Sequence, residues 1–538
     1  MRSNLISVLN RVLIAHLLGC CALFYSCEKT SSTDIDTDIT EEEIVDFTKL
    51  SDYSATSYPS TDVWTILDST LSTGPENFAG LKSAIAEAKI VNKELKLTLI
   101  FENIDEIPEY GLNEFGEYDS GGTYIDADLT IISVSAPKAK KIGKYAFNNC
   151  YVLSEINLPM ATTINDYAFY GCSALIELEL PMAETISSNA FYECNSITSF
   201  SLPNAVKIGD LAFKSCTALP SIELPSATVI GDYAFEKCNA LLSIDLPIVD
   251  TIGYFAFTEC ISLTSFTIPS TLRFLDAGAF SKCYSLEDIT ISGSSEFQFE
   301  DGVLTSSDGE NIHLVLDSKI NNGSFYSEKA INIDSYAFYG SSALKYITLP
   351  NVTKVGEYAF YNCSSLIGVA LNSVDTVMND AFASCNTLVN VSFPSARYIG
   401  NYAFNDCSRL STVDFPSLLT IGSYALYSCG TLSYVDLPEV QTVGDGAFDG
   451  NRSITYISIP KATSIGKWTF YNCSSLAQIY LATSSGTKID FIAEIQGVSY
   501  SSDIILCLGS ENQEYVKGST LTVGSYSASF KDIYFIDN

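Results

Sequence analysis

Carboxylate side chains recur at fixed positions in the first half of the chain, and their chemistry is considered first. They occupy the polar positions of a repeated L-x-x-I-x-L pattern, namely Glu155, Glu177, Glu179, Glu223, Asp245 and Asp288. Paired carboxylates can serve as acid and base in glycoside hydrolysis. The pattern predicts that these groups project from a flat or gently concave sheet with no evident pocket. We therefore expect a solvated acidic surface, and we do not expect an enzyme.

The same positions change character in the second half of the chain. They hold Tyr346, Asp414, Tyr434, Asp436, Tyr456 and Tyr480. Exposed, clustered tyrosine is typical of recognition surfaces. Tyr434 and Tyr456 occupy matching positions of successive repeats, so their rings should be neighbours. Tyrosine also favours strands, so stacking between repeats accounts for the same residues without a ligand. We interpret the six residues as a candidate binding face for a protein or glycan.

Cysteine and histidine are the other residues that could carry chemistry. Twelve of the sixteen cysteines share one repeat position: Cys150, Cys172, Cys194, Cys216, Cys238, Cys260, Cys283, Cys363, Cys385, Cys407, Cys429 and Cys473. Equivalent side chains on parallel strands point the same way, which disfavours the torsion of a disulfide, so we predict a column of buried thiols. No C-x-x-C pairing supports a metal site. Ser-His or Cys-His catalysis would depend on His313, because His16 falls in the leader. We expect His313 to be a solvated loop residue, and we expect no cofactor.

An Ala-Phe pair that returns every 22 residues predicts the elements that position these side chains. It ends at Phe147, Phe169, Phe191, Phe213, Phe235, Phe257 and, after 23 residues, Phe280; it resumes at Phe338, Phe360, Phe382, Phe404, Leu426, Phe448 and Phe470. A fixed period of this size indicates a solenoid. Each unit contains a short strand ended by proline, a second turn at Ile-Gly, and a Tyr-Ala-Phe-x-x-Cys stretch of about one helical or 3₁₀ turn.

The strand L-x-x-I-x-L-P, preceded by cysteine, resembles a leucine-rich repeat, and the added half I-G-x-Y-A-F-x-x-C is similar to the BspA-like class of bacterial leucine-rich repeats. The match covers about residues 127–481. Departures are local and include Ser341 and Asn451 in place of cysteine. The resemblance implies a solenoid with parallel strands on one face and short helical or 3₁₀ turns on the other. It also implies a cell-surface or secreted protein, with relatives that bind host proteins or other bacteria.

Composition and the N-terminal residues bound the setting. The net charge of −34 disfavours nucleic acid and direct attachment to anionic lipid. Arg2 and Arg11 precede an apolar stretch, Val12 to Tyr25, that ends at Ser26-Cys27, which resembles a bacterial lipoprotein signal. We expect lipidation at Cys27 and a location in the outer membrane or at the cell surface. An ordinary cleaved secretory signal, or lipidation at Cys20, remains the alternative.

The expected organisation follows from these patterns. Residues 1–26 form the signal peptide, 27–46 a flexible acidic tether, 47–126 an N-terminal cap region, 127–291 and 331–481 the repeats, and 482–538 a C-terminal cap. Residues 292–330 interrupt the repeats and should form a hairpin-like insertion or degenerate repeats, because they carry two Asp-Gly turn signals. We expect a monomer, held at a membrane only by its lipid, that binds a protein or glycan partner. The alternatives are a passive surface spacer or coat protein, or a carbohydrate-active enzyme that uses the strand carboxylates.

Overall fold

The computed structural model describes residues 96–112, 131–293 and 295–481, without the side chains of Lys319 and Asn321, together with the backbone of short strands outside these ranges. Those strands are β1 (Ile44–Val45), β2 (Val63–Asp68), β5 (Glu117–Tyr118), β6 (Tyr124–Ile125), β40 (Ile505–Gly509), β41 (Thr522–Val523), β42 (Tyr526–Ser527) and β43 (Asp532–Ile536). The signal and the tether lie outside the described residues, and so does Asn77–Asn92, where apolar residues on one side of the pattern predict a helix. Everything described except Ile44 belongs to one compact unit, Val45–Asn538.

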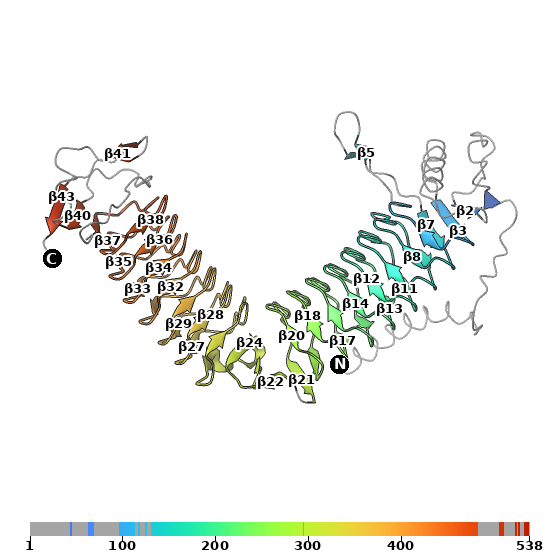
Figure 1. Ribbon diagram of the computed structural model, residues 1–538, viewed down its shortest axis with the longest axis horizontal. Coiled ribbons are helices and arrows are strands. Elements are labelled where there is room, and N and C mark those ends of the chain that lie inside the picture. Colours follow the sequence, from blue (N-terminus) through green and yellow to red (C-terminus); the bar gives the residue numbers. More distant parts are fainter. Residues whose placement is uncertain are drawn as a thin grey trace, which may run out of the picture. The chain divides into compact units, whose positions relative to one another are not determined.

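The repeats stack as coils whose first strands form parallel sheets (Figure 1). In β11 (Glu177–Glu179) the central Leu178 is buried and both glutamates are exposed, as the alternation of a half-buried strand predicts. Glu177 pairs with Ser199 and Leu178 with Phe200, so the register advances by one repeat. The equivalent strands are β3 (Lys96–Phe101), β7 (Ile131–Ser135), β9 (Glu155–Asn157), β13 (Ser199–Ser201), β15 (Ser221–Glu223), β17 (Ser243–Asp245), β19 (Ser265–Pro269), β21 (Asp288–Ser292), β25 (Ser324–Tyr326), β27 (Tyr346–Thr348), β29 (Gly368–Ala370), β31 (Asn390–Ser392), β33 (Thr412–Asp414), β35 (Tyr434–Asp436), β37 (Tyr456–Ser458) and β39 (Gln478–Leu481).

A second strand in each coil forms another parallel stack, where the sequence predicted only a turn. In β10 (Thr163–Ile164) the isoleucine is buried and pairs with Ile186 of the next coil. The residue after the strand is often glycine because the backbone of the preceding coil lies there: a Cβ on Gly209 would lie 2.6 Å from the carbonyl carbon of Ser187. The equivalents are β4 (Glu106–Ile107), β8 (Lys141–Ile142), β12 (Thr185–Ile186), β14 (Lys207–Ile208), β16 (Val229–Ile230), β18 (Thr251–Ile252), β20 (Phe274–Leu275), β26 (Asn332–Ile333), β28 (Lys354–Val355), β30 (Thr376–Val377), β32 (Tyr398–Ile399), β34 (Thr420–Ile421), β36 (Thr442–Val443) and β38 (Ser464–Ile465).

The Tyr-Ala-Phe-x-x-Cys stretch is a run of tight turns and not the helical or 3₁₀ turn that the sequence predicted. Tyr145 and Asn149 have φ of 57° and 61°, outside the right-handed helical region. The N–H of Phe147 donates 2.7 Å to the carbonyl of Ala168 in the next coil. Bonds of this kind to the next coil alternate with turn hydrogen bonds within the stretch, such as Asn148 N to the carbonyl of Tyr145 at 3.2 Å.

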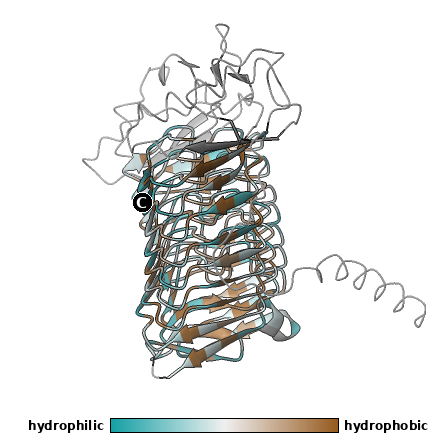
Figure 2. Ribbon diagram, turned by 90° about the vertical axis from the view of Figure 1, so that its right-hand side faces the viewer, coloured by the Kyte–Doolittle hydropathy of each residue, from teal (hydrophilic) through white to brown (hydrophobic). Residues whose placement is uncertain are grey.

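The core is a column of phenylalanines beside a column of thiols. The rings of Phe169 and Phe191 stack with centroids 5.1 Å apart. The twelve cysteines of the column are buried, as predicted, and Cys194 Sγ donates 3.1 Å to the carbonyl of Phe169 in the preceding coil. Apolar residues recur in the same strand position from coil to coil (Figure 2). The core divides into two clusters, and the division falls at the segment that interrupts the repeats.

That segment contains an antiparallel meander. β22 (Phe297–Glu300), β23 (Val303–Ser306) and β24 (Asn311–Val315) pair in turn, and β24 then pairs in parallel with β26 of the second block of repeats. Two 3₁₀ turns follow, η2 (Asp317–Lys319) and η3 (Asn321–Gly323). β25 pairs with β27 and so begins the first sheet of the second block.

Candidate functional site

Tyr434 and Tyr456 form a stacked pair on the first sheet of the second block. They are register partners on β35 and β37, and their ring centroids lie 4.9 Å apart with an interplanar angle of 6°. The predicted proximity of the two rings is confirmed. Tyr434 is 52% exposed, whereas Val435 and Ile457 beneath the pair are buried. The strands thus hold an aromatic surface in place by packing their other face into the core.

Two carboxylates lie beside this pair. Asp436 is on the same strand as Tyr434 and is exposed; among the described residues its carboxylate has no ion-pair or hydrogen-bond partner. Asp414, on the preceding coil, accepts a hydrogen bond of 2.7 Å from Ser392 Oγ. Partial desolvation raises the pKa of Tyr434, and the charge of Asp436 raises it further. The phenol therefore stays protonated at neutral pH and can donate a hydrogen bond to a ligand.

The other two predicted site residues do not belong to the stacked pair. Tyr480 is half-buried and is the register partner of Ser458, so it belongs to the column of the aspartates and not to that of the tyrosines. Tyr346 is 50% exposed, but the coils of Gly368, Asn390 and Thr412 separate it from Tyr434. The structure therefore brings together Tyr434, Tyr456 and Asp436, with Asp414 and Tyr480 on the two adjoining coils. Cys27 lies outside the described residues.

The carboxylates of the first block lie on the sheet surface as the strand pattern predicted. Glu179, Glu223 and Asp245 are all exposed, and Glu223 and Asp245 are register partners. Among the described residues, no group of three or more His, Cys, Asp or Glu side chains could hold a metal ion. No helix within the described ranges has the length and apolar character to cross a bilayer.

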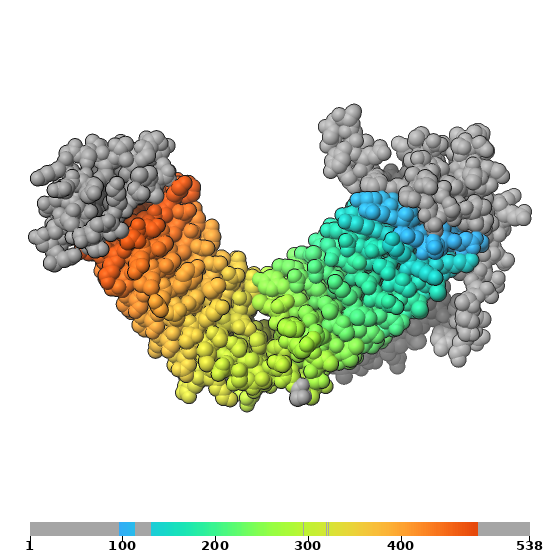
Figure 3. Space-filling model, in the orientation of Figure 1, coloured from blue at the N-terminus to red at the C-terminus, as the bar shows by residue number. Residues whose placement is uncertain are grey.

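The sequence reasoning missed a polar junction between the two blocks of repeats. Gly278 stands where most coils have a tyrosine or other large residue, so the ring of Phe255 leans into its place: a Cβ on Gly278 would lie 2.6 Å from that ring. Phe255 contacts Tyr336 of the second block, with centroids 4.6 Å apart. The surface is hollowed where the light green coils meet the yellow ones (Figure 3). The glycine alone is not a signal of the junction, because Gly446 stands at the same position within the second block.

His313 lies at this junction, and the expectation of a solvated loop histidine is wrong. It sits on β24 with its side chain 20% exposed, and its Nδ1 lies 2.6 Å from Asp334 Oδ2. Ser281 lines the same cavity, but its hydroxyl has no hydrogen-bond partner among the described atoms. The serine is therefore not bonded to the imidazole, and the three side chains do not form a connected nucleophile, base and acid.

Comparison with known proteins places the fold in a family. The family model described as "BspA type Leucine rich repeat region (6 copies)" matches residues 140–248, 206–332, 317–420 and 376–493, which together cover more than half of the chain. The chain belongs to the BspA-type leucine-rich repeat family.

Several solved structures are similar to this chain. A leucine-rich repeat protein from Bacteroides ovatus is 25% identical with a TM-score of 0.42, and the match covers 67% of this chain and 89% of that one. A leucine-rich cell surface protein from Faecalibacterium prausnitzii is 22% identical with a TM-score of 0.39, covering 74% and 87%. The pneumococcal vaccine antigen PcpA is 18% identical with a TM-score of 0.36, covering 81% and 85%. No curated protein matches the chain.

Proposed function

We propose that this chain is an exported lipoprotein, displayed at the bacterial cell surface, that binds a protein or glycan partner through its exposed sheet face. The observation that carries the proposal is the stacked, solvent-facing pair of Tyr434 and Tyr456 beside the exposed carboxylate of Asp436. The mechanism is multi-residue surface contact without covalent chemistry.

The physical basis is that this surface offers contact area already held in one conformation. Each tyrosine has few rotatable bonds, and stacking fixes both rings before a partner arrives, so little side-chain entropy is lost on binding. The phenol of Tyr434 donates hydrogen bonds, whereas Asp436 and Asp414 accept them. The neighbouring strands supply small polar groups such as Ser392 and Thr412 around this centre. An aromatic centre with a polar rim is the usual anatomy of a recognition surface.

The decisive experiment removes the two rings together. The Tyr434→Ala, Tyr456→Ala double variant should lose binding to a ligand found on a glycan array or a panel of purified extracellular proteins, while its melting temperature stays near that of the wild type. Tyr402 and Tyr424 provide the matched control, because they also stack, at 5.2 Å and 9°, but lie on the tight-turn stretch of their coils. The Tyr402→Ala, Tyr424→Ala variant should bind normally. Unchanged binding by the Tyr434, Tyr456 variant rejects this face.

Membrane attachment is proposed to depend on Cys27. Replacing it by alanine should leave the chain in the soluble fraction of lysed cells, because a lipid-modified terminus is the only membrane contact proposed. The matched control is Cys20→Ala, which alters the rival position and should leave attachment intact. Continued membrane association of Cys27→Ala would count against this anchor. If no ligand is found and the sheet face tolerates any polar substitution, a spacer or coat role replaces the binding role.

A further inference from the structure

From the coil of Phe147 to that of Phe448, backbone hydrogen bonds between coils follow one rule, and within this described range the rule is broken at one place. In each coil three N–H groups of the tight-turn stretch donate to carbonyls of the next coil. In the fifth coil Tyr233, Phe235 and Lys237 donate at 2.8, 2.7 and 2.9 Å. In the seventh coil the equivalent N–H groups are those of Gly278, Phe280 and Lys282. None of these three has an acceptor among the residues that the structure describes.

The first coil of the second block faces this edge with acceptors that are only partly used. The carbonyls of Ser335, Ala337 and Tyr339 stand at the positions that accept from the preceding coil elsewhere in the solenoid. They are therefore the expected acceptors for these three N–H groups. Ala337 instead accepts from Val315 N at 3.0 Å, and the other two have no donor within the described part of the chain. One side of the junction therefore presents donors and the other side presents acceptors, as if one stretch of backbone were missing between them.

A cavity of about 270 Å³ lies at this break. It is lined by residues 275–281 of the seventh coil, by His313 and Leu314, and by residues 334–336. The hydroxyl of Ser281 is buried there, with the residue 4% exposed, and has no partner. Buried polar groups are nearly always hydrogen-bonded, so an unsatisfied hydroxyl beside unsatisfied N–H groups points to a polar occupant.

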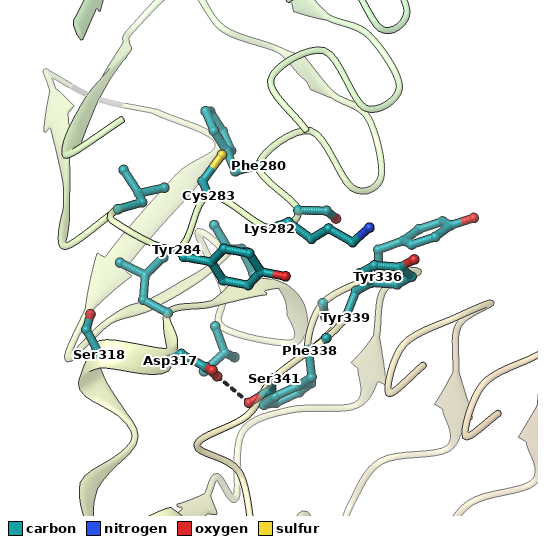
Figure 4. Close-up of a pocket in the computed structure, with 17 residues that line it drawn as sticks. Phe280, Lys282, Cys283, Tyr284, Asp317, Ser318, Tyr336, Phe338, Tyr339 and Ser341 are labelled. Atoms are coloured by element: carbon teal, nitrogen blue, oxygen red, sulfur yellow. Dashed lines mark hydrogen bonds between the residues drawn. The ribbon is translucent and has the colours of Figure 1, made fainter. Parts of the chain in front are cut away.

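A smaller cavity adjoins it and shares Phe280, Ser281, Leu314 and Tyr336 (Figure 4). Lys282 is already engaged on that side: its Nζ lies 2.8 Å from Glu259 and 5.5 Å from the ring centroid of Tyr339. Asp317, on the far wall, accepts from the hydroxyl of Ser341. In the smaller cavity Lys282 is thus paired with a carboxylate, and Asp317 is hydrogen-bonded within the fold.

The larger cavity carries excess negative charge. Asp276 and Asp334 occupy the position directly after the second strand, where most coils have glycine, and they are the only acidic residues at that position in the two blocks. His313 holds the same position on β24 and is bonded to Asp334. The carboxylate of Asp276 has no ion-pair or hydrogen-bond partner within the described residues, and partial desolvation together with the charge of Asp232 raises its pKa. The titratable groups lining the cavity are Asp276, His313, Asp334 and Tyr336.

We propose that this cavity binds the free amino end of a peptide, with the ammonium beside Asp276 and Asp334 and the first carbonyl accepting from the N–H groups of the seventh coil. The positive charge of the ammonium balances the negative charge of the two carboxylates. The peptide backbone supplies a carbonyl to the unpaired N–H groups of the seventh coil and an N–H to the unpaired carbonyls of the second block, as when a strand adds to the edge of a sheet. The cavity volume, on the order of that of nine water molecules, admits only small side chains near the amino terminus of the peptide.

The test uses the full chain and a defined probe, trialanine amide, in isothermal titration calorimetry. Binding should weaken by about tenfold or more when the probe is N-acetylated, because a lost charge-assisted contact of about 1.4 kcal/mol is a factor of ten. Asp276→Asn should weaken the binding of trialanine amide to a similar extent. Asp245→Asn, on the sheet surface of the first block, removes the same charge elsewhere and should have no effect.

A second pair of variants tests the cavity without altering charge. Ser281→Val removes the buried hydroxyl and fills part of the space, and should abolish binding. Thr258→Val makes a similar change at the equivalent position of the preceding coil, where Thr258 Oγ1 donates 3.0 Å to Gly278 O, and should leave binding intact. Equal binding of the acetylated probe, no binding of either probe, or binding of monosaccharides in place of the peptide would each overturn the proposal. These results are independent of Tyr434 and Tyr456.

Discussion

The hydroxyls of Tyr254 and Tyr336, 82 residues apart in sequence, lie 2.7 Å from one another and share a hydrogen bond. Tyr254 belongs to the sixth coil of the first block and Tyr336 to the first coil of the second. Tyr336 is only 8% exposed, and its ring also stacks on Tyr358 with centroids 5.0 Å apart. This bond therefore links the two aromatic columns across the segment that interrupts the repeats.

Breaking this bond should destabilise the protein. Tyr254→Phe leaves the hydroxyl of Tyr336 buried without its partner, which costs about 1–3 kcal/mol. Tyr254→Phe combined with Tyr336→Phe removes both polar groups and should cost less than the sum of the two single changes. Urea unfolding of the three variants measures the coupling, and strictly additive costs would contradict a shared bond.

The position of Asn451 in the thiol column yields a second prediction. This residue is fully buried, and its Nδ2 donates 2.6 Å to Leu426 O and 2.8 Å to Phe448 O, while its Oδ1 has no partner. Asn451→Cys keeps a donor and removes the unsatisfied oxygen, so we expect stabilisation by about 1 kcal/mol. Asn451→Ala leaves the carbonyls without a donor and should destabilise. Equilibrium unfolding orders the three proteins, and a destabilised Asn451→Cys would show that the oxygen has a role in the fold.

Two glycines give opposite expectations for the same substitution. A Cβ on Gly444 would lie 2.3 Å from Ser423 N and 2.5 Å from the carbonyl carbon of Gly422, both backbone atoms, so Gly444→Ala should cost about 1–3 kcal/mol. The nearest atom to a Cβ on Gly430 is Ser408 O at 3.5 Å, so Gly430→Ala should be neutral or stabilise slightly. Thermal unfolding of the two variants compares them directly. Equal melting temperatures would mean that the coils separate more easily than this spacing implies.

Stability should fall at alkaline pH because burial raises thiol pKa values. The pKa of Cys283 and that of Cys473 are both raised to about 12 by desolvation. Between the ordinary thiol pKa near 9 and pH 12, the unfolded chain has lost these protons while the folded chain retains them. The free energy of unfolding therefore decreases by up to about 1.4 kcal/mol per pH unit for each such thiol. Urea unfolding from pH 8 to 10.5 measures the slope, and Cys283→Ala should make it shallower.

The repeat pattern predicted much of the fold because every coil has the same residue types at the same positions. The stacked rings of Tyr434 and Tyr456 follow from one period of 22 residues and one strand per coil. The second sheet was missed because a two-residue strand such as Thr163–Ile164 is too short to show alternation, and only its pairing in the stack identifies it. The prediction of a helical turn was wrong because the φ of Tyr145 depends on a hydrogen bond to the next coil, which the local sequence does not encode.

The junction could not be predicted for a different reason. Gly278 and Asp276 were readable as departures from the repeat, but the cavity depends on how β24 is placed between the seventh coil and Asp334. That placement comes from antiparallel pairing within the interrupting segment, which has no counterpart in the other coils. The binding role of Tyr434, Tyr456 and Asp436 stays a prediction, since exposure and stacking describe a surface and not its partner.

The identical spacing of the coils has a genetic consequence. Phe169, Phe191 and Phe213 make the same contacts with their neighbours, one coil after another. A recombination event that deletes the codons between two equivalent positions would join ends that already match in hydrogen bonding, ring stacking and thiol placement. The number of coils can therefore change in whole steps without any new packing problem. The length of the solenoid is in that sense an inheritable quantity, separate from the residues exposed on its sheet face.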